Sequence, residues 1–165
     1  MELMGYQNAE LVYDIAAKGL LGKPSGDGLL TDDLAMNMLM YMALRTYNWP
    51  PTGKVLEYKR PCRYYTLGDM KMIDDMGMAI VPKILDIPEE QQFPIMKKRY
   101  ESAVTRLKRA RRFLVAQGLV KQLEKPRLIS GGRTNGGYLL LLGDEKENRE
   151  VEAWARECLS PAATL

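Results

Sequence analysis

The segment from Lys97 to Leu142 constrains the fold most, because it joins a basic helical pattern to two short strand patterns. Apolar residues recur at helical spacing up to Gly118, and GLVKQLE follows directly. The turn-rich sequence SGGRTNGG then leads into YLLLL. Glycine commonly ends a helix, and two apolar runs joined by Gly and Asn are typical of a β-hairpin. The segment therefore predicts a helix over about 94–117 and a hairpin over 119–142.

The predicted helix has two faces at 100° per residue. Its apolar side holds Tyr100, Ala103, Val104, Leu107, Ala110 and Leu114. Its polar side holds Ser102, Thr105, Arg106, Arg109 and Arg112. Two residues do not follow this division. Arg111 lies near the apolar side, where its stem can pack while the guanidinium reaches water, so we expect a structural role for it. Phe113 lies on the polar side and needs a contact from elsewhere in the protein or from a partner.

Positive charge is concentrated in the same segment. Residues 97–133 contain twelve Lys and Arg against two Glu, a local net charge of +10, whereas the whole chain carries only +3. The rest of the chain is therefore negative, at −7. A basic helix beside a hairpin makes nucleic acid the leading candidate partner. A solvated basic face that binds nothing is the plain structural alternative.

Two further helices are predicted before residue 50. Asn8 is a candidate N-cap for the first, which should end near residue 19. Residues 22–28 (GKPSGDG) read as a flexible connection. Thr31, followed by two aspartates, suits the start of the second helix, whose methionines we expect in the core. NWPP should end that helix near residue 47, because proline donates no backbone hydrogen bond.

The remaining elements are predicted from caps, prolines and periodicity. A short strand is expected near 55–58, and a helix over 67–76 with Thr66 as its cap. Three prolines make 78–96 an irregular segment with at most one short helix. Asp144 and a glutamate three residues later form a capping box for a last helix. That helix carries an apolar stripe, which should dock on the body or on a second subunit: Val151, Trp154, Ala155 and Cys158.

The composition excludes several kinds of active site. Histidine is absent, which removes Ser-His-Asp and Cys-His catalysis and His-ligated zinc. Neither a GxxxxGK[ST] loop nor a GxGxxG motif occurs. We therefore expect no enzyme, no metal and no cofactor. Cys62 and Cys158 are expected as free thiols rather than a disulfide. No apolar run approaches the ~20 residues of a membrane span, and no secretory signal opens the chain, so we expect a cytoplasmic protein.

The order helix, helix, basic helix, hairpin resembles a winged helix-turn-helix. RLKRARRFLVAQGLVKQLE, closed by GRTNGGYLLLL, resembles the recognition helix and wing of that family. LTDDLAMNMLMYMALRT resembles its first helix, and RYYTLGDMKMIDDMG its second. Together they resemble winged-helix proteins carried by bacterial phages and plasmids, among them transcriptional regulators and replication initiators. The resemblance implies an α+β fold with a winged-helix domain over 31–143, an N-terminal helix and linker over 1–30 and a C-terminal helix over 144–165.

On this reading the chain is expected to bind double-stranded DNA in a sequence-specific manner and to catalyse nothing. The expected DNA-binding residues are Lys97, Lys98, Arg99, Ser102, Thr105, Arg106, Lys108, Arg109, Arg112, Arg127, Arg133, Thr134 and Asn135. A homodimer through the C-terminal helix would suit palindromic sites. Two alternatives stay open. One is a winged-helix interaction module that binds an acidic protein, with Phe113 and residues 78–96 in the interface; the other is a protein that binds structured RNA.

Overall fold

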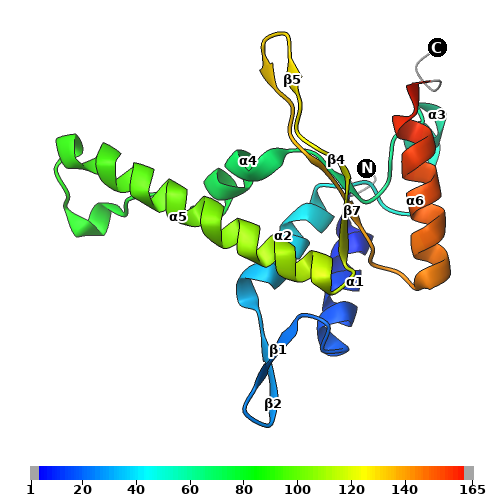
Figure 1. Ribbon diagram of the computed structural model, residues 1–165, viewed down its shortest axis with the longest axis horizontal. Helices are drawn as coiled ribbons and strands as arrows, with labels where there is room; N and C mark the ends of the chain where they lie inside the picture. The colour runs from blue at the N-terminus through cyan, green and yellow to red at the C-terminus, as the bar shows by residue number, and fades with distance from the viewer. Residues whose placement is uncertain (1–3, 162–165) are drawn as a thin grey trace.

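The computed structural model describes residues 4–161. Residues 1–3 of the expected N-terminal segment and 162–165 of the expected C-terminal helix lie outside the described residues. The described part is an α+β protein with six α-helices, a three-stranded sheet and two small hairpins (Figure 1). Its elements are α1 Tyr6–Ala17, β1 Gly22–Ser25, β2 Gly28–Thr31, α2 Asp33–Leu44, α3 Gly53–Glu57, β3 Tyr64–Tyr65, α4 Gly68–Asp75, the 3-10 turn η1 Lys83–Leu85, α5 Glu89–Ala116, β4 Val120–Glu124, β5 Leu128–Ile129, β6 Gly132–Arg133, β7 Gly137–Leu140 and α6 Glu145–Leu159.

The core lies where α2 packs against α1 and α5, with β7 beside them. Met38 and Met42 of α2 are buried there, as the helical spacing predicts. Leu107 and Leu114 of α5 are wholly buried, and each such leucine contributes about 1.5–3 kcal/mol relative to an exposed one. The apolar side predicted for the basic helix is therefore the side that packs.

The three-stranded sheet is antiparallel, with the order β3-β7-β4. Val120 of β4 pairs with Leu140 of β7, which confirms the predicted hairpin. On the other edge of β7, Tyr64 of β3 pairs with Leu139. The sequence did not predict β3 as a strand; both of its tyrosines are buried. The hairpin continues outward as β5 and β6, which project from the body as a separate ribbon (Figure 1).

Two connecting segments differ from their predictions. Residues 22–28, expected to be a flexible connection, belong to the β1–β2 hairpin, in which Gly22 pairs with Thr31 and Ser25 with Gly28. Lys23 of β1 also forms an ion pair with Asp32, so charge and backbone pairing both order the segment. The prediction of a strand near 55–58 is wrong, because the short helix α3 covers this segment up to Glu57 and Tyr58 is its C-cap.

Three predicted caps are also wrong. Asp32, not Thr31, is the N-cap of α2, and its carboxylate accepts a hydrogen bond from the Ala35 N–H at 2.9 Å. Thr66 does not cap α4, which begins after Leu67 without a side-chain cap. Asn8 lies inside α1 rather than at its start, because Gly5 takes the N-cap position with φ +77°, a conformation that suits glycine.

The basic helix α5 begins five residues earlier than predicted, at Glu89, and contains Pro94 in its second turn. Proline there removes one backbone hydrogen bond, and for this reason the sequence predicted a helix boundary at this residue. Glu89 and Glu90 suit the positive end of the helix dipole and favour the earlier start. The first turns of α5 extend beyond the body of the molecule (Figure 1).

The last helix, α6, docks on its own chain. Asp144 accepts a hydrogen bond from the Glu147 N–H at 2.8 Å, as predicted, but the Glu147 carboxylate turns to Arg63 instead of completing the box. Val151 and Ala155 are wholly buried against a cluster that includes Tyr64 and Leu139. Trp154 also donates a hydrogen bond to the Arg60 carbonyl, so three of the four residues of the stripe that was expected to dock on the body or on a second subunit contact the same chain.

Candidate nucleic-acid interface

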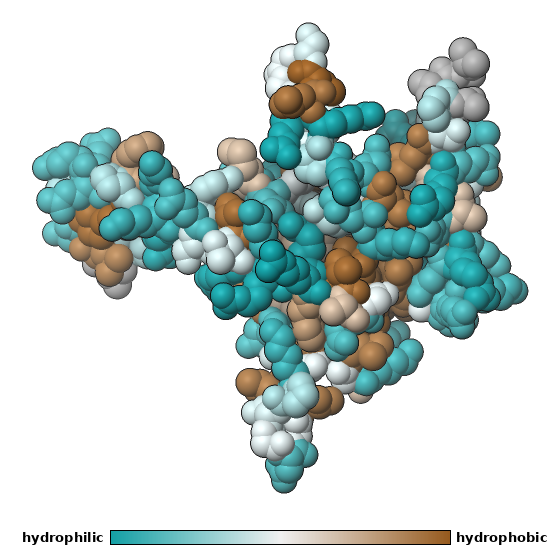
Figure 2. All heavy atoms as spheres, viewed as in Figure 1, coloured by the Kyte–Doolittle hydropathy of each residue, from teal (hydrophilic) through white to brown (hydrophobic). Residues whose placement is uncertain are grey.

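The outer face of α5 carries the nine helical residues predicted to bind DNA. All nine side chains are exposed: Lys97, Lys98, Arg99, Ser102, Thr105, Arg106, Lys108, Arg109 and Arg112. Figure 2 shows a largely hydrophilic surface along this helix. Thr105 donates a hydrogen bond to the Glu101 carbonyl at 3.2 Å, which leaves its hydroxyl oxygen able to accept.

Fewer cations form ion pairs in the segment that contains this face, residues 97–133, than in the rest of the described chain. Outside residues 97–133, eight of the twelve Lys and Arg side chains form ion pairs: Lys23, Arg45, Lys59, Arg63, Lys71, Lys146, Arg149 and Arg156. Of the twelve inside that range, only Arg111 and Lys121 have an acidic partner among residues 4–161. Most of the other cations are thus neutralised by an ion pair, whereas ten of the twelve between residues 97 and 133 have no acidic partner among the described residues.

A helix beginning near residue 94, as the sequence predicted, would place Lys97, Lys98 and Arg99 close to its N-terminus, but the structure does not place them there. Because α5 begins at Glu89, these residues sit in its third turn. The helix dipole acts within about one turn of an end, so it does not assist anion binding here. Any attraction for phosphate comes from the side-chain charges themselves.

Arg111 and Phe113 both serve the fold. Arg111 forms an ion pair with Asp69 of α4, and its guanidinium carbon lies 4.7 Å from the Tyr138 ring centroid. The expected structural role of Arg111 is confirmed. Phe113 is half-buried, and the Lys23 ammonium lies 4.8 Å from its ring centroid. The contact that Phe113 required thus comes from β1 of the same chain.

The ribbon of β5 and β6 forms the tip of the hairpin predicted as the wing. Arg127, directly before β5, and Arg133 of β6 are exposed, without an acidic partner in the described part of the chain. Thr134 and Asn135, by contrast, hold the ribbon in place. Thr134 Oγ1 accepts a hydrogen bond from the Arg127 N–H at 3.0 Å. Asn135 Nδ2 donates to the Thr66 carbonyl at 3.0 Å, which ties the ribbon to the segment before α4.

Sequence reasoning missed two apolar residues at the same tip. Leu128 is 85% exposed and Ile129 is 54% exposed, directly beside the wing arginines. The sequence PRLISGG could have indicated them, because two apolar residues directly precede a predicted tight turn, where side chains are usually exposed. The wing therefore offers both cationic and apolar side chains.

A polar cluster fixes α4, the helix before α5, against α2. The Tyr41 hydroxyl donates to Asp75 at 2.7 Å, and the Arg45 guanidinium carbon lies 3.6 Å from the Tyr41 ring centroid. Hydrogen bonds from Lys71 and then Tyr41 lower the pKa of Asp75. Burial, together with the hydrogen bond to Asp75, raises the pKa of Tyr41 to about 12. The cluster therefore holds a charged carboxylate between the two helices.

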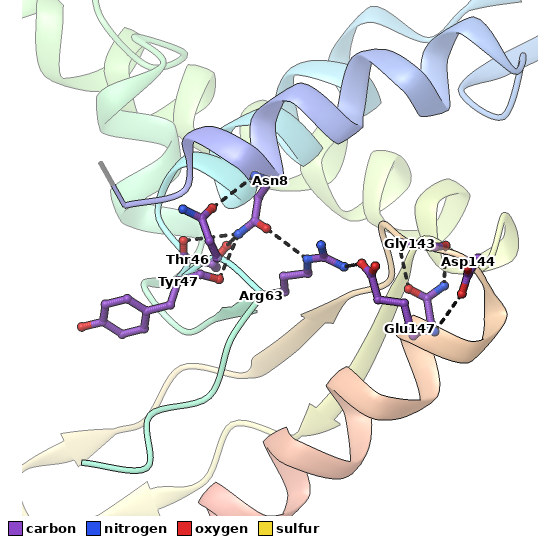
Figure 3. Close-up of polar contacts among 9 residues, drawn as sticks. Asn8, Thr46, Tyr47, Arg63, Gly143, Asp144 and Glu147 are labelled. Carbon is purple, nitrogen blue, oxygen red and sulfur yellow. Dashed lines mark hydrogen bonds and ion pairs between the residues drawn. The ribbon is translucent and has the colours of Figure 1, made fainter. Parts of the chain in front are cut away.

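A second polar network joins α1 to α6 (Figure 3). Asn8 is wholly buried and donates to the Tyr47 carbonyl at 3.0 Å. Arg63, also buried, donates from Nε to Asn8 Oδ1 at 3.0 Å and forms an ion pair with Glu147. A buried charge is tolerated only when paired in this way. The network couples residues far apart in sequence, so no local pattern could have revealed it.

Metal, thiol and membrane features add little to this site. Within residues 4–161, no three or more His, Cys, Asp and Glu side chains are grouped to hold a metal ion. Cys62 and Cys158 are free thiols, as predicted, and burial raises the pKa of Cys62 to about 11. None of the helices in the described chain is both long and apolar enough to cross a membrane.

Comparisons with known proteins do not extend these observations. No protein-family model, curated protein or solved structure matches this chain.

Proposed function

We propose that this protein is a winged-helix protein that binds double-stranded DNA sequence-specifically, as a transcriptional regulator or replication initiator of a phage or plasmid. The order α2, β3, α4, α5, β4, β7 supports the winged-helix reading, as does the sheet order β3-β7-β4. The proposal gives the protein no catalytic step and places it in the cytoplasm.

The uncompensated basic face of α5 carries this proposal. An arginine on an ordinary solvated surface gains from a nearby carboxylate, and most of the other cations in this chain have one. Cations kept free of such partners, on a helix whose opposite side is buried, form a surface complementary to a polyanion. An α-helix of this kind fits the major groove of B-DNA.

The geometry suggests a division of roles along α5. Arg106 and Arg109 are exposed on the same helical face, about one turn apart, and in this proposal they would read guanine through its O6 and N7 atoms. Ser102 and Thr105 supply neutral hydrogen-bonding groups beside them. The remaining cations of the helix, and Arg127 and Arg133 of the wing, would neutralise phosphates or enter the minor groove.

The first test is selection of bound sequences from a random duplex pool, followed by affinity measurements on the enriched site. Replacing Arg106 and Arg109 together by Ala should weaken binding to that site roughly 30-fold or more, since each bidentate contact contributes about 1–3 kcal/mol. The matched control replaces Lys146 and Arg149 of α6, which removes the same charge from an exposed helix and should change affinity little. Unchanged affinity in the α5 double variant would overturn the assignment of α5.

An interaction module that binds an acidic protein is the second candidate, and one observation favours it. Exposed apolar side chains gather around the projecting start of α5, where Phe93 is 74% exposed and Leu85 is 57% exposed. Lys97 and Lys98 follow them, so an apolar and acidic partner would fit. Failure to enrich any duplex sequence, together with a binding partner lost in Phe93→Ala, would favour this second function. Competition between duplex DNA and RNA of matched length separates DNA from RNA binding.

A further inference from the structure

A cleft of about 570 Å³ opens between the start of α1, the segment after α2, and α3. Its lining includes three tyrosines, the apolar Pro50 and Val55, and the basic residues Lys54 and Arg60. Clefts that hold small ligands have volumes of about 300–1,000 Å³ and combine apolar walls with a few polar groups. This cleft has both properties. None of the described lining residues is among those expected to bind DNA. Helix α3 also lies toward the opposite end of the molecule from the projecting start of α5 (Figure 1).

Three of the eleven described lining residues of the cleft are tyrosines. Tyr6, Tyr47 and Tyr58 line it from three different segments, together with the apolar Val55 and Pro50. Tyr6 is 54% exposed and Tyr58 is 59% exposed, so neither side chain is buried in the core. Tyrosine faces bind planar rings by stacking, and their negative quadrupoles also attract cations.

Arg60 lies within this aromatic group. Its guanidinium carbon is 5.9 Å from the ring centroids of both Tyr47 and Tyr58, and its Nη1 donates to the Tyr47 hydroxyl at 2.8 Å. A guanidinium has five N–H donors, and Lys54 adds an ammonium to the same lining. No Asp or Glu belongs to the described lining, and no acidic partner of Arg60 or Lys54 occurs in residues 4–161. The described lining therefore carries its positive charge at Arg60 and Lys54, while the Glu10 carboxylate outside the lining hydrogen-bonds to Tyr6.

The rest of the fold holds these groups in position. The buried Asn8 donates to the Tyr47 carbonyl, and its backbone N–H donates to Asn48 Oδ1 at 3.3 Å. In Figure 3 the ring of Tyr47 points away from Asn8, so the network fixes its backbone and leaves the ring outside. On the opposite side, Trp154 of α6 donates from Nε1 to the Arg60 carbonyl at 2.9 Å. A site held in this way loses less conformational entropy on binding.

We propose that this cleft binds a planar aromatic anion, a small molecule with a flat ring system and a carboxylate or phosphate. The ring would stack against the tyrosines while the anion binds Arg60 and Lys54. Arginine suits this role because its planar fork matches both carboxylate and phosphate bidentately. The inference does not depend on the proposed DNA binding.

Isothermal titration calorimetry on the full chain, in the absence of DNA, tests the proposal. The probes are AMP and indole-3-acetate, with adenosine and indole-3-acetamide as the matched neutral molecules, and inorganic phosphate as an anion without a ring. At least one of the two aromatic anions should bind, tenfold or more tightly than its neutral counterpart and than phosphate. Binding of AMP alone identifies a phosphate ligand, and binding of indole-3-acetate alone identifies a carboxylate.

Variants locate the binding to this cleft. Arg60→Gln and Tyr58→Leu should each weaken the bound anion at least tenfold. Lys18→Gln and Tyr13→Leu are the matched controls, because both residues are exposed on or next to α1 and neither lines the cleft. The controls should bind as the natural protein does. The proposal is overturned if neither anion binds at millimolar concentration, if the neutral molecules bind equally well, or if Arg60→Gln leaves the affinity unchanged.

Discussion

Arg111 and Arg112 are adjacent on α5 and have opposite roles. Arg111 pairs with Asp69, and both side chains are mostly covered, at 15% and 28% exposure. Arg112 is exposed. Arg111→Ala should lower the free energy of unfolding by about 1–3 kcal/mol, because it removes the packed stem and leaves a half-buried carboxylate without a partner. Arg112→Ala should change it by less than about 0.5 kcal/mol.

Urea unfolding of the two variants measures this difference. DNA affinity, measured on folded protein, should respond in the reverse order, since only Arg112 faces outward. Equal destabilisation by the two substitutions would contradict the structural role of Arg111.

The carboxyl group of Asp75 should make the stability of the protein depend on pH. Its pKa in the folded protein lies below the ordinary value of 3.8, because Lys71 and Tyr41 hydrogen-bond to its charged form. A carboxyl with a lowered folded pKa stabilises the protein above its unfolded pKa, and this contribution is lost as the pH falls through the folded pKa. Asp75→Asn should therefore be less stable than the natural protein near pH 7, and the difference should shrink below pH 3.8.

Thermal unfolding between pH 7 and pH 2 checks this expectation. Asp74→Asn is the matched control, because Asp74 is exposed and has no ion pair within residues 4–161. The prediction is wrong if both variants show the same dependence on pH.

Asn135 attaches the wing to the segment directly before α4, close to Gly68. Gly68 has φ +81°, and a Cβ there would overlap the Asn135 side chain that bonds to Thr66. Gly118 has a similar φ of +73° but open space around it. Gly118→Ala should cost about 1 kcal/mol from backbone strain alone. Gly68→Ala should cost about 1 kcal/mol more, since it also displaces the Asn135 hydrogen bond.

A double-mutant cycle measures this contact directly. If Asn135 is displaced in Gly68→Ala, then adding Asn135→Ala should cost less in that background than in the natural protein. Hydrogen exchange of β5 and β6 should also become faster in either single variant. Strict additivity would show that Asn135 does not fasten the wing.

The same elements show what the sequence could and could not predict. The buried side of α5 and the β4–β7 hairpin followed from periodicity and glycine placement, because both are local properties. The start of α5 was missed because a proline in the second turn resembles a boundary. The β1–β2 hairpin was missed because GKPSGDG has no alternation of apolar and polar residues. At the site, exposure on α5 was predictable, whereas the use of Thr134 and Asn135 depends on contacts with distant segments.

Unpaired and paired cations lie in different parts of the molecule. Uncompensated cations gather on α5 and the wing, while cations elsewhere are mostly paired. Neutralising DNA phosphates releases counterions, so log K should fall with log salt by about 0.9 per phosphate contacted. Replacing Arg127 and Arg133 together by Ala should make this slope shallower by about 2, because each arginine then leaves one phosphate unneutralised.

Base reading and phosphate contact can be separated with the same titration. The wing variant should weaken specific and non-specific duplexes to a similar degree, since phosphate contacts carry no sequence information. The variant with Arg106→Ala and Arg109→Ala should lose affinity mainly for the selected site, so its ratio of specific to non-specific binding falls. The control that replaces Lys146 and Arg149 should change neither slope nor ratio, because these cations already have acidic partners on α6. If the wing variant lowered the ratio and the helix variant lowered only the slope, then the wing would read the bases and α5 would hold the backbone, the reverse of the arrangement proposed.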